Sequence, residues 1–335
     1  MQADIVSQVE DLSTRIRKVR AAIGRTIFGQ DDVVDRTLIA LLSGGHALLV
    51  GVPGLGKSRL VETIGTVLGL GTKRIQFTPD LMPADIVGSE VLEEADGRRA
   101  FRFVRGPVFC QLLMADEINR ASPRTQSALL QAMQERRVSV GGEDYTLEPP
   151  FHVLATQNPI EQEGTYPLPE AQLDRFLLQI DVGYPNEEEE RRMLHATTGA
   201  YDAKAEPEPG YSAERLIDDQ ALVRQVPVPP DVVDAIVALV RSGRPETPNN
   251  PNPMVSRYVA WGPGPRAAQA LMLAVRARAL LQGRICPSTE DVYNLAHPVL
   301  RHRMALNFAA RAEGIVLNDL IDRLAEPWRP IALQR

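Results

Sequence analysis

Residues 51–58 read Gly51-Val52-Pro53-Gly54-Leu55-Gly56-Lys57-Ser58. Glycines let a backbone turn tightly and aim successive N–H groups inward, which is an arrangement that binds phosphate oxygens. In loops of this pattern the lysine reaches the β- and γ-phosphates of a nucleotide, and the hydroxyl after it ligates Mg²⁺. We therefore predict a phosphate-binding loop in which Ser58 is also a metal ligand and the nucleotide is bound by Gly51, Pro53, Gly54, Gly56, Lys57, Ser58 and Arg59.

The sequence on either side of this loop supports the prediction. Residues 46–50 form a short apolar run typical of a buried strand, and residues 59–68 have the pattern of a helix. The positive end of a helix that begins there adds to the binding of anions. An ordinary glycine-rich turn is the alternative, and the position between a strand and a helix disfavours it.

Composition restricts the class of protein. The 335 residues are 44% hydrophobic, which is typical of a globular chain. Lys and Arg number 37 against 43 Asp and Glu, so the net charge of −6 does not favour wrapping nucleic acid. Cys110 and Cys286 lie far apart without metal-ligand spacing, which indicates free thiols in a reducing compartment. Neither a signal peptide nor an apolar run long enough to cross a membrane is found, so we expect a cytoplasmic protein.

Apolar runs that alternate with helical segments predict the fold. Candidate strands lie at residues 46–50, 73–77, 109–115, 151–156 and 177–181. Helices lie between several of them, which predicts a mainly parallel α/β sheet with the phosphate loop at its carboxyl edge. Two helical patterns precede the sheet, with apolar residues from Ile5 to Ile23 and from Val33 to Leu42.

Two segments interrupt this alternation and have the pattern of antiparallel hairpins. Residues 89–92 and 100–104 flank an Asp96-Gly97 turn, and residues 137–140 and 144–147 flank Gly141-Gly142. Such insertions either contact partners or simply extend the sheet domain, and the residues alone leave both interpretations open.

Helical signals dominate after residue 185. Asn186 is placed to cap a helix, residues 203–210 have the composition of an exposed connection, and residues 227–231 begin another helix. A third helix is predicted at 265–281 with Gly283 as its stop, and Ser288 caps a fourth that we expect to end before Pro298. Residues 244–253 form a long loop. We predict an α/β nucleotide-binding domain over 1–185 and an α-helical lid domain over 186–335.

Two carboxylates follow a second apolar strand. Residues 109–115 lead into Asp116-Glu117, and parallel strands would bring these side chains to the edge that holds the phosphate loop. There Asp116 would hold Mg²⁺ through its water shell and Glu117 would polarise an attacking water. The alternative is a helix that begins after an apolar run. Asn158 follows the strand at 151–156 at the same edge, where its amide could orient the water and touch the γ-phosphate.

Three longer motifs resemble the MoxR family of AAA+ ATPases. They are Ala115-Asp-Glu-Ile-Asn-Arg-Ala121, residues 126–135, and Asn158-Pro-Ile-Glu-Gln-Glu-Gly-Thr-Tyr-Pro-Leu-Pro-Glu-Ala-Gln-Leu-Asp-Arg-Phe176. The similarity is dense over residues 27–176 and looser over the helical region. The hairpins resemble insertions of the wider clade, and the C-terminal helices resemble the AAA+ lid.

This resemblance implies ATP and Mg²⁺ as cofactors and a role for three further residues. Asn158 would be the first sensor, Arg175 the arginine finger offered to a neighbouring subunit, and Arg266, in the run Gly262-Pro-Gly-Pro-Arg-Ala267, the second sensor acting from the lid. A fixed charge with forked donors suits a transition state whose negative charge spreads. Two departures are Gly264, where serine is expected, and Val50, where an acidic residue is common.

The resemblance also implies an assembly and a kind of work. It suggests a homo-oligomer, in the form of a hexameric ring, that remodels or matures client complexes, including partners with von Willebrand factor A domains. The alternatives are a chelatase-type ATPase subunit for metal insertion and a DNA-acting AAA+ motor. The first hairpin is basic through Arg98, Arg99, Arg102 and Arg105, although the acidic chain makes nucleic acid a poor partner. A GTPase-type switch is disfavoured because no Asn/Thr-Lys-x-Asp motif occurs.

Overall fold

The computed structural model describes residues 2–95, 98–160, 164–198, 210–247, 250 and 252–330. The predicted turn at Asp96-Gly97 and most of the predicted connection at 203–210 lie outside these residues, as do positions 248, 249 and 251 of the predicted long loop. In the described part of the chain no helix is both long and apolar enough to span a bilayer.

A five-stranded parallel sheet forms the centre of the first region, with the strand order β2-β5-β8-β1-β9. Its strands are β1 (Ala47–Val50), β2 (Thr72–Gln76), β5 (Leu112–Asp116), β8 (His152–Gln157) and β9 (Leu178–Asp181). In the register of the sheet, Val50 lies beside Gln157, and Ala115 lies beside Ala155. The segments that follow β1, β5 and β8 therefore emerge at one edge, and the predicted α/β sheet is confirmed.

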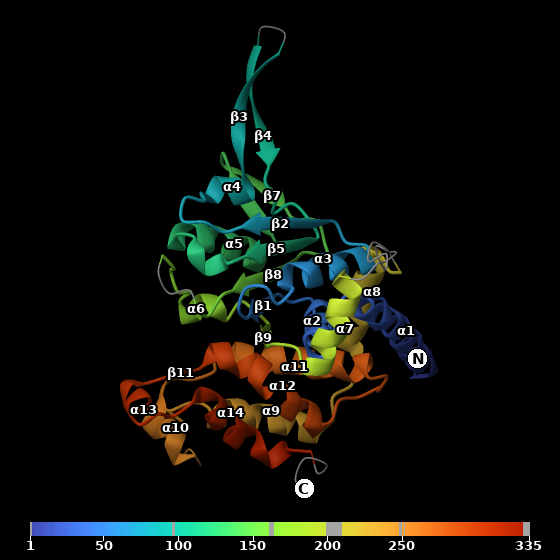
Figure 1. The fold of residues 1–335 in the computed structure, drawn as a ribbon, viewed down its shortest axis with the longest axis vertical. Coiled ribbons are helices and arrows are strands. Elements are labelled where there is room, and N and C mark those ends of the chain that lie inside the picture. Colours follow the sequence, from blue (N-terminus) through green and yellow to red (C-terminus); the bar gives the residue numbers. More distant parts are fainter. Residues whose placement is uncertain are drawn as a thin grey trace.

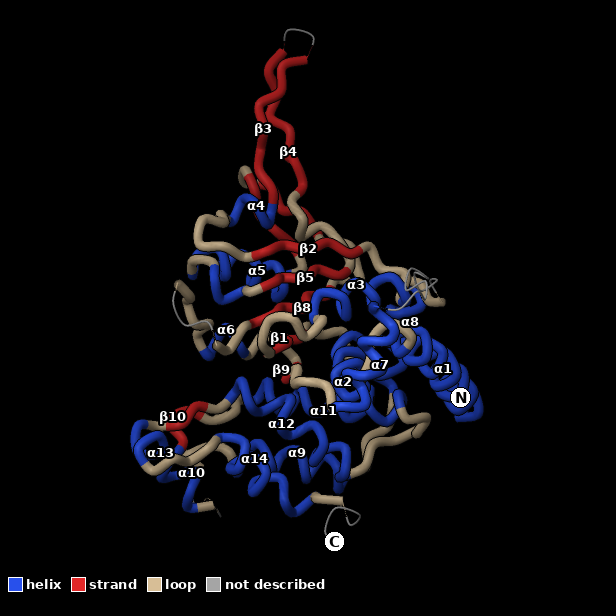
Figure 2. Tube along the Cα trace, viewed as in Figure 1, coloured by secondary structure: helices blue, strands red, loops and turns tan. Residues whose placement is uncertain are grey.

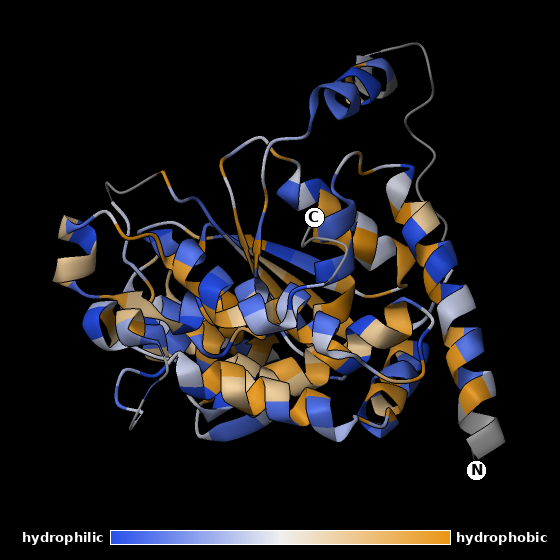
Figure 3. Cartoon of the chain, turned by 90° about the horizontal axis from the view of Figure 1, so that it is seen from below, coloured by the Kyte–Doolittle hydropathy of each residue, from blue (hydrophilic) through white to orange (hydrophobic). Residues whose placement is uncertain are grey.

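Helices cover both faces of this sheet. Successive side chains of a strand point to opposite faces, and those of the central strands are buried on both. Leu49 packs with the long helices α1 (Gln2–Gly24), α2 (Asp31–Leu42) and α3 (Lys57–Val67), and Leu48 belongs to a second cluster with α5 (Pro123–Glu135). Figure 3 shows apolar and polar residues alternating along α1, the helix at the labelled N-terminus. The predicted opening helix is confirmed, since its buried side chains recur at helical spacing at Val9, Leu12, Ile16, Val19 and Ile23.

Both predicted hairpins are present, and the first is longer than expected. After α4 (Pro83–Val87), β3 (Gly88–Ala95) pairs with β4 (Arg98–Arg105) and projects from one end of the molecule (Figures 1 and 2). The second hairpin consists of β6 (Arg137–Val140) and β7 (Glu143–Thr146). The two are joined at their bases, where the Phe103 ring stacks on Tyr145 at 4.1 Å between centroids.

In the residues that the structure describes, the second region is helical apart from one short strand pair. Its part from residue 230 onward lies at the end of the molecule opposite the long hairpin, whereas residues 213–225 lie beside α1 and α2 (Figure 1). Its α11 (Pro265–Leu281) contacts α1 and α2, and its α12 (Thr289–Leu300) contacts β9. The strand pair is β10 (Val259–Trp261) with β11 (Ala305–Leu306). The helices are α7 (Glu187–Thr198), α8 (Ala213–Gln225), α9 (Pro230–Ser242), α10 (Pro253–Tyr258), α11 (Pro265–Leu281), α12 (Thr289–Leu300), α13 (Phe308–Ala312) and α14 (Leu317–Ala325).

One helix end was predicted wrongly. We expected the helix capped by Ser288 to end before Pro298, but α12 runs through the proline to Leu300. Proline costs about 3 kcal/mol inside a helix, and burial of Val299 and Leu300 offsets that cost. The predicted caps Asn186 and Ser288 are confirmed, and the division of the chain at residue 185 stays a prediction.

Candidate functional site

The phosphate loop joins β1 to α3 in the geometry that its glycines predict. Gly54 and Gly56 have φ angles of 84° and 72°, values that residues other than glycine rarely adopt. The Lys57 ammonium donates to the carbonyl oxygens of Gly51 at 2.5 Å and Val52 at 2.7 Å. The loop therefore closes around its own lysine, and its N–H groups precede the positive end of α3.

The predicted catalytic residues of the sheet edge share one pocket with this loop. It has a volume of about 410 Å³. Its lining brings together Pro53, Gly54, Leu55, Gly56, Lys57, Ser58, Arg59, Asp116, Glu117, Thr156 and Asn158. Burial lowers the pKa of Lys57, while the charges of Asp116 and Glu117 act in the opposite direction. The two carboxylates thus lie close enough to the lysine to stabilise its positive charge.

Asp116 is the last residue of β5, and both of its oxygens have partners. The Thr156 hydroxyl donates to Oδ1 at 2.5 Å, and Arg74 Nη2 lies 2.5 Å from Oδ2. Thr156 reaches this position because the register that pairs Ala115 with Ala155 continues by one residue. Sequence analysis missed Arg74 and Thr156; a polar residue within the apolar run of β8 was the available signal for Thr156.

Glu117 lies at the turn after β5 in an uncommon conformation. Its φ and ψ of 55° and 51° are left-handed, which costs a residue with a side chain about 1–2 kcal/mol. The N–H of Glu117 donates to the Thr156 hydroxyl at 2.8 Å. Its carboxylate accepts from Gln76 Nε2 at 2.8 Å and from Arg120 Nη1 at 3.0 Å. The neighbouring strands β2 and β8 therefore both fix the orientation of Glu117.

A second pocket of about 360 Å³ adjoins the phosphate loop. The residues that it shares with the first pocket are Pro53, Gly54, Leu55, Gly56 and Arg59. Its remaining lining comes from a linker and a helix and includes Ile27, Phe28 and Tyr184. Gln30 donates to the carbonyl oxygen of Leu55 at 2.9 Å, which ties this linker to the loop. Aromatic and aliphatic walls next to a phosphate loop suit the flat base of a nucleotide. Sequence analysis missed this pocket, because its walls combine residues 26–30 with residues 184–193, which are far apart in the sequence.

The two predicted arginines lie together, away from both pockets. Arg175 follows the short helix α6 (Glu170–Leu173), and Arg266 lies in the first turn of α11. Arg266 Nη1 is 3.7 Å from Asp174 Oδ2, and the charge of Arg266 reinforces the effect of burial in lowering the pKa of Arg175. Neither arginine is among the described residues that line these two pockets.

Comparison with known proteins assigns the family. A model of the ATPase family associated with various cellular activities (AAA) matches residues 46–178, and a model of the AAA lid domain matches residues 252–324. The chain is 43% identical to the chaperone MoxR1 of Mycobacterium tuberculosis over 96% of its own length and 84% of that protein. The chain belongs to the MoxR family of AAA+ ATPases.

Two further similarities extend over nearly the whole chain. Protein MoxR of Paracoccus denitrificans is 32% identical to this MoxR-family chain, over 92% of the chain and 95% of that protein. The crystal structure of a proposed ATPase from Cytophaga hutchinsonii superposes with a TM-score of 0.87 at 34% identity, covering 97% of this chain and 98% of the other. The AAA+ α/β domain and the helical lid of this MoxR-family ATPase are thus those of known relatives.

Proposed function

We propose that this protein is an ATP-hydrolysing chaperone of the MoxR type, which works as a hexameric ring and remodels or matures client protein complexes. The observation that carries the proposal is the single pocket that holds Lys57, Asp116, Glu117 and Asn158 at the carboxyl edge of the sheet. Such an edge binds nucleotides in open α/β sheets. Membership in an ATPase family supports the same reaction.

The pocket offers the groups that phosphoryl transfer needs. Ser58 and Asp116 both line it and supply hard oxygen donors, which fit Mg²⁺. The cation would neutralise charge on the phosphates when bound. Lys57 binds phosphate oxygens, Glu117 takes the proton of the attacking water, and Asn158 orients that water as the first sensor. The adjoining pocket at Ile27 and Phe28 binds the base.

The position of Arg175 and Arg266 supports a ring. Both arginines lie away from the nucleotide pockets of their own chain and beside one another. We infer that this face meets the pocket of the next subunit, where Arg175 acts as the arginine finger and Arg266 as the second sensor. An arginine supplied by a neighbouring subunit can raise turnover by a factor of about 10³–10⁵. Hydrolysis then requires assembly.

The long hairpin indicates the kind of partner that the protein contacts. The long hairpin carries the exposed apolar side chains Leu92 and Phe101, which supports contact with a protein partner. Its arginines pair in part with its own acidic residues, as in Arg102 with Glu93 and Arg99 with Glu94, and this disfavours nucleic acid as the partner. Clients or adaptors with von Willebrand factor A domains, and a cytoplasmic location, belong to the proposal. A chelatase-type subunit is the alternative, and metal-insertion assays distinguish it.

The substitution Glu117→Gln tests the reaction. It removes the proton acceptor and keeps the shape of the side chain, so ATP binding and ring assembly should persist while turnover falls by at least about 10²-fold. Glu10→Gln, an exposed change on α1, is the matched control and should behave as wild type. Normal turnover by the Glu117→Gln protein would refute the assignment of the base.

The same variant tests the client role. Because it should retain ATP, it should also retain clients that release only on hydrolysis. Affinity capture with the Glu117→Gln ring, with Lys57→Ala as the control that binds no nucleotide, should enrich specific partners with ATP present. Equal capture by both variants would contradict an ATP-driven cycle on clients.

A further inference from the structure

Arg303 is a fully buried cation that the roles given so far do not use. It ends the short helix η2 (Arg301–Arg303) that follows α12, and the residue is 2% exposed. An isolated charge at such depth is costly, so its hydrogen-bond partners must account for its presence. Its burial could not be predicted from local sequence, because all but one of these partners lie more than 120 positions away.

The partners of Arg303 surround the predicted arginine finger on both sides. Its Nε donates to Asp174 Oδ1 at 2.7 Å. Its Nη2 donates to the carbonyl oxygen of Phe176 at 2.7 Å, and its Nη1 donates to that of Leu177 at 3.1 Å. Arg175 lies between these anchored positions. A planar guanidinium with five donors suits such a set of contacts, and a lysine cannot reproduce it.

The same guanidinium is also fixed to the lid. Its Nη1 donates to the carbonyl oxygen of Val299 in α12 at 2.7 Å. The neighbouring His302 lies 3.0 Å from the carbonyl oxygen of Phe176 through Nε2. Asp174, which Arg303 holds, is the residue that Arg266 approaches from α11. One buried cluster therefore joins two lid elements to the segment that carries Arg175.

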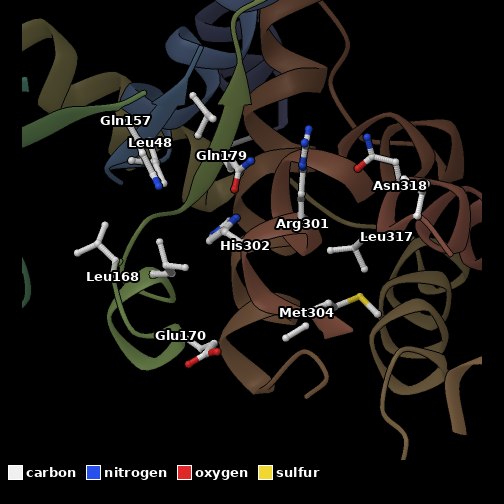
Figure 4. A pocket seen from close by; sticks show the side chains of 14 residues that line it. Leu48, Gln157, Leu168, Glu170, Gln179, Arg301, His302, Met304, Leu317 and Asn318 are labelled. Carbon is white, nitrogen blue, oxygen red and sulfur yellow. The ribbon is translucent and has the colours of Figure 1, made fainter. Parts of the chain in front are cut away.

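The cluster of Arg303, His302 and Asp174 lies next to a cavity. A pocket of about 470 Å³ lies beside it, between the edge of the sheet and the lid. Figure 4 shows Leu168 and Glu170 on one side of this pocket, with Arg301, His302 and Met304 on the lid side. The polar contacts of Arg303 and His302 join the lid to residues 174–177 beside this pocket, and α12 also packs against β9 directly after them. A shift of the lid therefore acts on residues 174–177 through these contacts together with that packing.

We propose that Arg303 is a positioning residue that couples the lid of one subunit to the arginine finger it offers to the next. When the lid moves with the nucleotide state of its own chain, Arg303 carries the segment 174–177 with it and sets the reach of Arg175. This inference rests on the proposed role of Arg175 between subunits. The competing interpretation is a buried anchor that serves stability alone.

The first step in separating these interpretations is to measure turnover and nucleotide affinity in a variant of Arg303. Arg303→Lys keeps the positive charge and loses the planar guanidinium with its several donors. Turnover should therefore fall by about 10²-fold, which is the cost of a small misplacement of a catalytic group such as Arg175. Nucleotide affinity should stay within about twofold of wild type, because the pocket of the same chain is intact. Arg301→Lys, on the same turn but paired with Asp181, is the matched control and should keep wild-type turnover.

Mixed rings supply the deciding measurement. Subunits with Arg303→Lys have an intact Glu117 and a misplaced finger, whereas Glu117→Gln subunits have the reverse. An equal mixture should regain about a quarter of wild-type turnover, since half of the sites are intact and half of those meet an intact finger. A subunit that is merely unstable would not be rescued.

Each other result overturns a defined part of the inference. Wild-type turnover by Arg303→Lys, or a loss that mixing does not restore, would refute the coupling role. Wild-type turnover by Arg175→Ala would instead refute the proposed function on which the inference rests. If Arg303→Lys fails to bind nucleotide, Asp174→Asn decides by the same mixture, because it breaks the cluster at its less buried partner.

Discussion

The substitution Thr156→Val tests how the two carboxylates of the site are held. Valine has nearly the shape of threonine, so the change removes a hydroxyl and preserves the packing. That hydroxyl donates to Asp116 at 2.5 Å and accepts from the Glu117 N–H at 2.8 Å, in a fully buried position. A single substitution therefore removes both hydrogen bonds.

The structure sets the size of the effect. A hydrogen bond to a charged group contributes about 1.5–3 kcal/mol, and a buried N–H left without an acceptor costs about 1–3 kcal/mol. Both terms involve one hydroxyl and do not add in full, so we expect the free energy of unfolding to fall by about 3 kcal/mol. The left-handed conformation of Glu117 loses its restraint, and a loss of about 1.4 kcal/mol there lowers kcat about tenfold.

Urea unfolding and steady-state ATP turnover at saturating nucleotide measure the two effects. Thr156→Ser is the matched control, since it keeps the hydroxyl and loses only a methyl group; its kcat should stay within about twofold. A folded Thr156→Val protein with wild-type turnover would show that the hydroxyl does not position Glu117. Equal losses in both variants would assign the effect to packing.

Three further outcomes are expected. Arg74→Met frees the Asp116 oxygen that Arg74 occupies, so the Mg²⁺ concentration for half-maximal turnover should fall several-fold; a rise would mean that Arg74 positions Asp116 instead. Burial lowers the pKa of His46 to about 3 and that of His152 to about 4, whereas both titrate near 6.5 in the unfolded chain. The stability that these neutral rings contribute should therefore be complete above pH 6.5 and fall toward pH 4, by about 1.4 kcal/mol per shifted pKa unit. Thermal melts over this range should show the loss, and a flat profile would contradict the burial of neutral rings. Gly88→Ala places a Cβ 2.6 Å from the Gly106 nitrogen at a φ of 100°. The free energy of unfolding should therefore fall by about 2–4 kcal/mol. An unchanged urea midpoint would show that the base of the hairpin adapts.

Local patterns predicted the centre of the site because its key residues follow strands. The loop that carries Lys57 follows the apolar run at 46–50, Asp116 follows that at 109–115, and Asn158 lies two positions after that at 151–156. Parallel strands bring their carboxyl ends to one edge whatever their order. The phosphate loop and its flanking elements could therefore be predicted from short stretches of sequence. The hairpins were recognisable for the same reason, since alternation and turn residues are local.

Other features depend on contacts between distant positions. Thr156 meets Asp116 only because β8 pairs with β5 in one particular register, and Arg303 meets Asp174 only after the lid folds back on the sheet. Pro298 predicted a helix end locally, and burial of α12 overrode it. The mutual proximity of Arg175 and Arg266 could not be predicted either, because it is set by the placement of α11.

The length of the first hairpin has a mechanical consequence. Each strand has 8 residues, which at about 3.3 Å per residue gives an arm of about 26 Å. The stacked rings of Phe103 and Tyr145 hold only its base. A rotation of about 10° at that base would displace the far end by about 4–5 Å, nearly the spacing of two strands. Small rearrangements at the sheet would thus be amplified into displacements of several ångströms at the far end of the arm.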